Sequence, residues 1–316
     1  MSIAGGLHKA VERAAEIGCD CVQLFTAPPG QWQIKANSRP MRAMVDQEST
    51  AKTRVRDGGL LCKNNNQWRA KEITDDDAAR FRAALAATGV SHPLVHDSYL
   101  INLASPDDVL WGKSIEAFQV ELLRAEKLGI PFVVTHPGAF TTSTEAAGIQ
   151  RVIEALDRTH RETEGIQAQV LLENTAGQGS CLGWKFEHLA AMISGVKRPE
   201  LVGVCIDTCH TLAGGYPLQS ADEYEATIGE LDRVVGLGKV KAIHVNDSKQ
   251  GLGSRVDRHE HIGRGKLGLE AFRHLVNDSR FAETPMYLET AKEQENGEEM
   301  DVVNLRTLRG LIATNG

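Results

Sequence analysis

The chain lacks the features that would place it in a membrane or outside the cell. No apolar run of about 18 residues occurs among its 316 residues, so no membrane-spanning helix is predicted. The amino-terminal stretch MSIAGGLHKAVERAAE is amphipathic and lacks the apolar core of a signal peptide. The sequence therefore predicts a cytoplasmic protein.

Paired cysteines and an excess of positive charge are also missing. The cysteines are Cys19, Cys21, Cys62, Cys181, Cys205 and Cys209. None of them shows a CxxC spacing, and we interpret all six as reduced thiols in the core. The formal net charge of −7 argues against non-specific binding of nucleic acid. A local positive field is still compatible with this charge, because bound metal ions are often the largest charges in a site.

Apolar runs typical of buried parallel strands alternate with helical patterns along the chain. Strands are predicted at residues 21–25, 94–96, 131–136, 168–173, 202–207, 240–245 and 286–289. Helices are predicted at residues 7–17, 143–164, 185–193, 269–277 and 302–312. Three further helices have recognisable starts, at Thr74 with Asp77, at Ser105 before a proline, and at Ser220 with Glu223.

These elements add up to eight helices and seven strands, and the first helix has no strand before it. The alternation predicts an α/β fold of the TIM-type (β/α)8 barrel class, formed as a single domain over residues 1–316. This barrel would lack its first amino-terminal strand and would carry an inserted loop at residues 27–62.

Nine side chains of the types that bind metal ions stand at or near the ends of the apolar runs. They are His96, His136, Glu173, Asp207, His210, His244, Asp257, His259 and Glu289. In a parallel α/β barrel the carboxyl ends of all strands face one mouth, so residues remote in sequence converge there. Five imidazoles and four carboxylates exceed the needs of one ion, and nitrogen and oxygen ligands suit zinc. The pattern predicts a polynuclear zinc site.

Single members of this set have simpler interpretations. A lone histidine at a strand end often only lines a barrel mouth, and Asp207 with His210 could cap the helix that follows GVCIDTCH. Asp257 and His259 could belong to a solvated charged turn. His261, close by, either orients a ligand from outside or lies on the surface.

Seven separated blocks of the sequence carry a resemblance to a known family. They are HDSYLINLASP, THPGA, ENTAGQGS, GVCIDTCH, HVNDSK, GSRVDRHEHIGRG and LET. In order, spacing and ligand type they resemble the signature blocks of the endonuclease IV family, which are zinc-dependent abasic-site DNA-repair endonucleases with a barrel fold. The resemblance runs from Ser2 to about Ile312 and is interrupted once.

The resemblance implies a trinuclear zinc site and a substrate. His96, His136 and Glu173 would hold one ion, Glu173 would bridge to a second that also takes Asp207, His244 and Glu289, and His210, Asp257 and His259 would hold the third. The implied substrate is double-stranded DNA with an abasic site, cut 5′ to the lesion to leave a 3′-hydroxyl, with a 3′-end phosphodiesterase activity beside it. We expect a monomer, because the duplex should fit one barrel mouth.

The ligand set also suggests how the reaction would proceed. Three divalent ions bring six positive charges against four carboxylates, so the site stays cationic inside an acidic protein. Positive charge that is in place before the reaction suits the transition state of phosphodiester hydrolysis. A water shared by two ions would be deprotonated near neutral pH and could attack phosphorus in line. Glu173 is the predicted catalytic residue, as a bridging ligand that also organises the hydroxide.

Two loops carry the expected DNA contacts. Tyr99 follows His96 by three residues, where the family has an aromatic that enters the duplex, and stacking there fits extrusion of the lesion. The segment NNNQWRA resembles a second recognition loop of the family, with Asn66, Trp68 and Arg69 as its candidate DNA-binding residues. Asn66 stands where the family has an intercalating arginine, and it lacks the charge and planar reach of a guanidinium. Alternatively, Tyr99 and Trp68 are packing residues of the rim.

Two stretches depart from the family pattern. MSIAGGL stands where the family has a strand, and without that strand two neighbours lose a partner and leave exposed edges. Residues 27–62 are inserted, with six basic and three acidic residues and the breaks APPG and DGG, which are typical of a loop. Two hypotheses for this stretch stay open: its positive charge helps to hold DNA phosphate, or it is a disordered insertion of little effect.

Two other classes of protein stay open. Sugar isomerases and epimerases on related barrels also place Glu, Asp and His at strand ends, although they usually need one or two ions. The additional set of His210, Asp257 and His259 argues against that class. A non-catalytic protein that binds abasic duplexes without cutting them is the second alternative, but a complete ligand set has no evident purpose in a passive binder.

Overall fold

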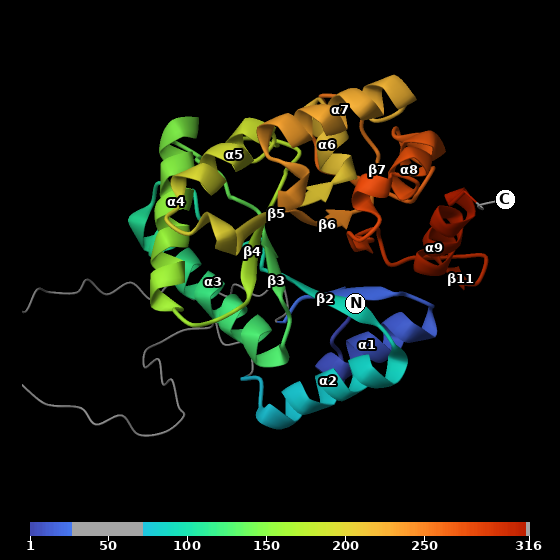
Figure 1. Cartoon of the computed structure of the whole chain (residues 1–316), viewed down its shortest axis with the longest axis horizontal. Coiled ribbons are helices and arrows are strands. Elements are labelled where there is room, and N and C mark those ends of the chain that lie inside the picture. The colour runs from blue at the N-terminus through green and yellow to red at the C-terminus, as the bar shows by residue number, and fades with distance from the viewer. Residues whose placement is uncertain (27–71, 314–316) are drawn as a thin grey trace, which may run out of the picture.

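The computed structural model describes residues 1–26 and 72–313, which form a barrel of parallel strands surrounded by helices (Figure 1). Seven strands make one sheet in the order β1-β2-β3-β4-β5-β6-β9, and each neighbouring pair is parallel. Their bounds are β1 Cys21–Leu24, β2 Ser91–His96, β3 Phe132–Thr135, β4 Gln169–Glu173, β5 Val202–Asp207, β6 Val240–His244 and β9 Met286–Tyr287. The predicted TIM-type fold and its seven strands are confirmed.

Helices connect the strands across the outside of the sheet. The described residues hold α1 Leu7–Glu16, α2 Asp75–Thr88, α3 Asp108–Leu128, α4 Glu145–Glu162, α5 Phe186–Gly195, α6 Thr208–Gly214, α7 Ala221–Val234, α8 Gly268–Val276 and α9 Met300–Leu311. They also hold the short 3-10 helices Pro199–Leu201, Leu237–Lys239 and Ser279–Phe281, and the two-residue strands β7 Asp247–Ser248, β8 His259–Glu260, β10 Gln294–Glu295 and β11 Glu298–Glu299. The eight predicted helices are present, and α6 is an additional one. Within these ranges no helix has the length and apolarity that a membrane span requires.

The helix starts follow the predicted capping residues in two of three cases. Thr74 and Ser220 each form a capping box, so the predicted starts of α2 and α7 are confirmed. The predicted start of α3 at Ser105 is wrong, because Asp107 is its N-cap and accepts from the backbone N–H of Leu110 over 2.8 Å. The Ser105 hydroxyl accepts instead from the backbone N–H of Asp107, so it supports the capping residue from the preceding turn.

Two apolar cores lie on opposite faces of the sheet. The larger one joins strands to helices, for example through Val95, Val133 and Phe118. The smaller one consists of strand residues only and fills the barrel interior; it contains Leu94, Val134, Leu171, Cys205, Ala242 and Tyr287. Because successive side chains of a strand point to opposite faces, strands with two buried faces have continuous apolar sequences.

Among the described residues, the sheet is open between β1 and β9. In the described part of the chain, each of these strands has a hydrogen-bonded strand partner on one side only. This is the arrangement expected for a barrel of seven strands that lacks its first strand. The two edges still lie close together, because the Cys21 thiol donates to the carbonyl of Met286 over 3.1 Å. The amino group of Met1 donates to the carbonyl of Gln23 over 2.6 Å. We call the junction between β1 and β9 the seam.

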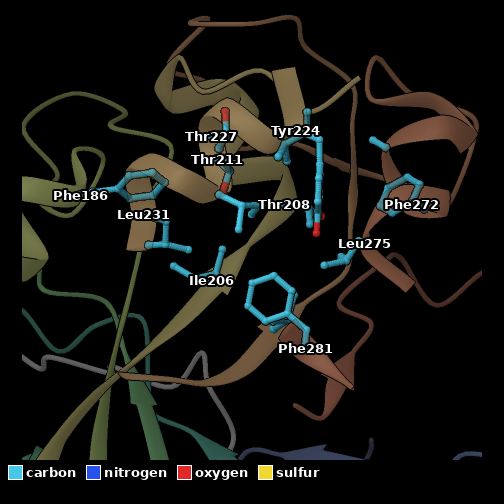
Figure 2. Close-up of a pocket in the computed structure, with 14 residues that line it drawn as sticks. Phe186, Ile206, Thr208, Thr211, Tyr224, Thr227, Leu231, Phe272, Leu275 and Phe281 are labelled. Carbon is cyan, nitrogen blue, oxygen red and sulfur yellow. The ribbon is translucent and has the colours of Figure 1, made fainter. Parts of the chain in front are cut away.

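A small apolar space lies on the outer face of β5 and β6, beside α7 and α8. Figure 2 shows Ile206, Leu231, Leu275 and Phe281 gathered around it. Its lining consists of apolar, threonine and tyrosine side chains. This space therefore belongs to the packing between sheet and helices, and the candidate ligands lie on the other face.

Truncating a side chain of the barrel interior should destabilise the protein strongly. Leu171 has no exposed surface, and Leu171→Ala should lower the free energy of unfolding by about 2–5 kcal/mol because it leaves a cavity. Urea denaturation measures this change. Val120→Ala, on the exposed face of α3 where Val120 is 45% exposed, should change it by less than about 0.5 kcal/mol. Equal effects of the two substitutions would contradict the assignment of the interior core.

Candidate metal centre

The alternation of side chains along the strands determines where the candidate ligands lie. On six strands, a candidate ligand follows two positions after a side chain of the barrel interior, so it points inward one layer nearer the mouth. These pairs are Leu94 and His96, Val134 and His136, Leu171 and Glu173, Cys205 and Asp207, Ala242 and His244, and Tyr287 and Glu289. On β1 the same spacing leads from Cys21 to Gln23.

The other three candidates come from segments attached to the ends of β5 and β6. Asp207 ends β5 and caps α6, since its carboxylate accepts from the backbone N–H of His210 over 2.7 Å. This cap fixes His210 in the first turn of α6, directly above the strand end. Asp257 and His259 lie at the start of β8, in the hairpin that follows β6. Capping by Asp207 and membership of the cluster are thus compatible.

Glu173 occupies the centre of the cluster and has no exposed surface. Its Oε2 lies 3.0 Å from Nε2 of His96 and 3.2 Å from Nε2 of His136. Its Oε1 lies 3.0 Å from Nδ1 of His244 and 3.3 Å from Nδ1 of His210. The two oxygens of one carboxylate therefore face two different pairs of imidazoles.

The structure brings all nine candidates together. In the described ranges, ligand atoms within 4.8 Å of one another form the groups His96–His136–Glu173, Glu173–Asp207–His244–Glu289 and His210–Asp257–His259. These are the three sets that the family resemblance implies. A fourth group joins Cys209 to Asp207 and His259. Burial raises the pKa of the Cys209 thiol to about 12, and the thiol donates to the carbonyl oxygen of Arg258 over 3.7 Å, which favours a packing role for Cys209.

Four of the five imidazoles place one ring nitrogen against a carbonyl oxygen. The contacts are His96 Nδ1 to O of Asp97 at 2.9 Å, His210 Nδ1 to O of Asn174 at 2.9 Å, His259 Nδ1 to O of Glu289 at 3.3 Å, and His244 Nε2 to Oε1 of Gln23 at 2.7 Å. A carbonyl oxygen can only accept, so each of these nitrogens carries the proton. The other nitrogen of each ring therefore presents a lone pair to the cluster.

Those lone pairs face carboxylates, which are also acceptors. Nε2 of His210 lies 3.3 Å from Oδ2 of Asp257, and Nε2 of His259 lies 3.4 Å from Oδ1 of the same carboxylate. Both nitrogens are buried and have no hydrogen-bond partner. Two acceptors at such distances are held together only by a cation between them, either a proton or a metal ion. The residues present therefore fit a metal centre.

The pKa shifts of His96 and Glu173 also indicate that the cluster favours bound positive charge. Burial lowers the pKa of His96, but the hydrogen bond to Glu173 and the charge of that carboxylate raise it further, to about 9. Burial would raise the pKa of Glu173, yet the charges of His244 and His136 hold it well below its usual range. The carboxylates thus stay ionised and bind protons through the imidazoles when no other cation is present.

The side-chain amides of Asn246 and Gln23 hydrogen-bond to candidate ligands from outside the cluster. Neither residue was among the residues predicted from the sequence. Asn246 has no exposed surface; its Nδ2 donates to Oδ2 of Asp207 over 2.6 Å and its Oδ1 accepts from the backbone N–H of Glu289 over 2.7 Å. Gln23 contacts His244 and Glu289. Their signal in the sequence is a polar amide inside or directly after an apolar strand, in CVQLF and HVND.

The structure locates only part of the expected DNA contacts. Tyr99 is 64% exposed and follows the ligand-bearing strand β2, so it is free to contact a partner at the mouth. Asn66, Trp68 and Arg69 lie outside the described residues, as does the insertion at 27–62. His261 is buried against Asn304, with Nδ1 at 3.0 Å from that amide, so its surface interpretation is wrong.

Comparisons with known proteins agree with this fold. Residues 55–308 match the family described as xylose isomerase-like TIM barrel. The chain is 44% identical over 312 residues to the "Probable endonuclease 4" of Geobacter sp. (strain M21), covering 99% of this chain and 97% of that protein. Its structure resembles the crystal structure of endonuclease IV from Thermus thermophilus, with a TM-score of 0.76, 32% identity and coverage of 98% and 96%.

The fold and the rim of ligands define a TIM-barrel protein of the xylose isomerase-like class. The D-psicose 3-epimerase of Clostridium cellulolyticum shares only the fold with this chain, with a TM-score of 0.58 and 14% identity. The identity of 44% with the Geobacter protein, over nearly the full length of both chains, identifies the family within this class. The chain belongs to the endonuclease IV family and is a nuclease.

We expect the metal affinity of this cluster to fall as the pH falls. The imidazoles must lose their extra protons before a metal ion can bind, and the raised pKa of His96, about 9, extends this competition above neutral pH. Each proton released per ion gives about a tenfold change in affinity per pH unit. Competition with a chromophoric chelator at pH 6, 7 and 8 measures the slope. An affinity independent of pH would exclude ligation by these imidazoles.

Proposed function

We propose that the chain is a DNA-repair endonuclease that hydrolyses the phosphodiester 5′ to an abasic site and leaves a 3′-hydroxyl, with a 3′-end phosphodiesterase activity at the same site. The supporting observation is the convergence of five imidazoles and four carboxylates around Glu173 in a chain of the endonuclease IV family. The protein acts as a monomer formed by one barrel domain, and double-stranded DNA is its partner.

Three sets of residues would hold three zinc ions. They are His96, His136 and Glu173; Glu173, Asp207, His244 and Glu289; and His210, Asp257 and His259. When bound, zinc supplies positive charge to the phosphoryl oxygens and makes a hydroxide nucleophile available from water near neutral pH.

The protein's own residues prepare the site for this chemistry. Glu173 belongs to two of the three sets, and its two oxygens face different imidazoles, so one carboxylate fixes the relative position of both sets. The backbone carbonyls and Gln23 fix the imidazole tautomers before substrate arrives, so no reorganisation is required during the reaction. His136 is 33% and Asp257 42% exposed, whereas Glu173 is fully buried; the phosphate therefore approaches from the side of His136 and Asp257.

Incision of a duplex that carries one stable abasic analogue tests the proposal. The protein, purified without chelator, should cut once, 5′ to the lesion, and leave a 3′-hydroxyl that a polymerase can extend. Glu173→Gln should lower kcat/KM by at least about 100-fold, because loss of a shared ligand exceeds the effect of an outer-shell change. Glu187→Gln, an exposed glutamate on α5, is the matched control and should leave the rate unchanged.

Two outcomes would overturn the proposal in different ways. Tight binding of the abasic duplex without incision, in protein that contains metal, would favour a lesion-binding protein. Turnover of free ketohexoses without incision would favour an epimerase. The epimerase alternative currently rests on the fold alone, and the third set of ligands exceeds the one or two ions that such enzymes use.

Removing the exposed ring of Tyr99 should weaken recognition of the lesion. An aromatic that stacks in the duplex contributes about 1–3 kcal/mol, so Tyr99→Ala should lower affinity for the abasic duplex about 5- to 150-fold. Fluorescence anisotropy measures this affinity, and the metal content should not change. Leu269→Ala is the control, since Leu269 is also exposed, at 42%, but lies on α8. Unchanged affinity would make Tyr99 an ordinary rim residue.

A further inference from the structure

We propose that Gln23 is a positioning residue of the metal centre, whose single amide holds His244 and Glu289 in their ligating orientations across the seam. This inference rests on the proposed metal-dependent function. It concerns a residue that offers no ligand of the metal-binding types and lies on the strand without a candidate ligand.

The backbone brings Gln23 to the layer of the ligands. It follows Cys21 by two residues, as each inward-facing ligand follows a residue of the barrel interior, and it is half-buried. β1 and β9 form the seam, so Gln23 faces Glu289, which follows β9 by two residues. In the described residues β1 therefore contributes an amide where the other six strands contribute imidazole or carboxylate.

The hydrogen bonds leave one assignment for the amide. Nε2 of Gln23 donates to Oε1 of Glu289 over 2.5 Å, because an ionised carboxylate can only accept. Oε1 of Gln23 then faces Nε2 of His244 at 2.7 Å and can only accept, so this imidazole nitrogen carries the proton. The lone pair of His244 must consequently be on Nδ1.

The remaining atoms of both partners point to one place. Nδ1 of His244 lies 3.0 Å from Oε1 of Glu173 and 3.1 Å from Oε2 of Glu289. Gln23 thus binds Nε2 of His244 and Oε1 of Glu289, which point away from the cluster. Nδ1 of His244 and Oε2 of Glu289 stay available to bind a cation. One amide fixes two members of the set Glu173–Asp207–His244–Glu289.

His244 depends on a side chain where other imidazoles depend on the backbone. His96, His210 and His259 donate to backbone carbonyls, which no substitution removes. Glu289 is 19% exposed and belongs to a segment that follows an edge strand, so its carboxylate has freedom to turn towards solvent. Loss of Gln23 should therefore affect this one set and spare the other two.

Gln23→Met removes both hydrogen bonds at similar side-chain volume. We expect one of the bound ions to be held about 10- to 100-fold more weakly, measured by competition with a chromophoric chelator, while the others keep their affinity. Reconstitution with Co²⁺ should show altered visible absorption, because the ligand geometry at that ion changes. Gln23→Asn keeps the amide but withdraws it by one methylene, and it should show the same loss.

A purely structural tie across the seam predicts a different result. It would lower the urea midpoint of the chelator-treated protein, whereas a positioning role leaves that midpoint near the wild-type value. Gln119→Met is the matched control, since Nε2 of Gln119 donates to Oε2 of Glu162 over 2.9 Å on the exposed surface between α3 and α4. It should leave metal affinity and Co²⁺ absorption unchanged.

The outcomes separate this inference from the proposed function. Wild-type metal affinities and Co²⁺ absorption in both Gln23 variants would overturn the role of Gln23, whatever the incision assay shows. The same holds if only the urea midpoint of the chelator-treated protein falls. Selective loss of one ion in a protein that does not cut abasic DNA would support the role of Gln23 and overturn the nuclease proposal. A wild-type protein that binds no metal would overturn both.

Discussion

The carboxylate of Glu173, buried without exposed surface among four imidazoles, is the constraint on which the site depends. Its two oxygens lie 3.0 to 3.3 Å from the ring nitrogens of His96, His210 and His244, and His136 completes the set. A buried charge of this kind is costly unless positive charge accompanies it. The strands that carry Glu173, His96 and His244 must therefore keep their register, since a shift by one residue would turn these side chains outward into the apolar helix-facing core.

Much of the fold could be predicted from the sequence because parallel strands with two buried faces are short, continuous apolar runs. The convergence of the candidate ligands could be predicted for a related reason, since an ionisable residue at the end of such a run, as in LLENT or GVCID, points to a strand end at the mouth. The cap of α3 at Asp107 could not be distinguished from Ser105, because both have capping side chains within two residues of each other.

The amides of Gln23 and Asn246 could not be predicted for a deeper reason. Their roles depend on contacts between residues far apart in the chain, such as Gln23 with His244 and Glu289, and an amide has no residue-type signal of metal binding. The fold does not determine the chemistry either, because a sugar epimerase shares this barrel at only 14% identity. What distinguishes this chain is the set of side chains on the rim and the groups that hold them.

The seam between β1 and β9 also has a kinetic consequence. In the described residues β1 and β9 each have one strand partner. A sheet opens first at such edges in thermal fluctuations, and their amide protons exchange earliest with solvent. Gln23 belongs to one edge and Glu289 follows the other, so each opening also parts these two groups. The rate of amide exchange in β9 and the dissociation rate of an ion held by Glu289 would then both report the rate at which the seam opens.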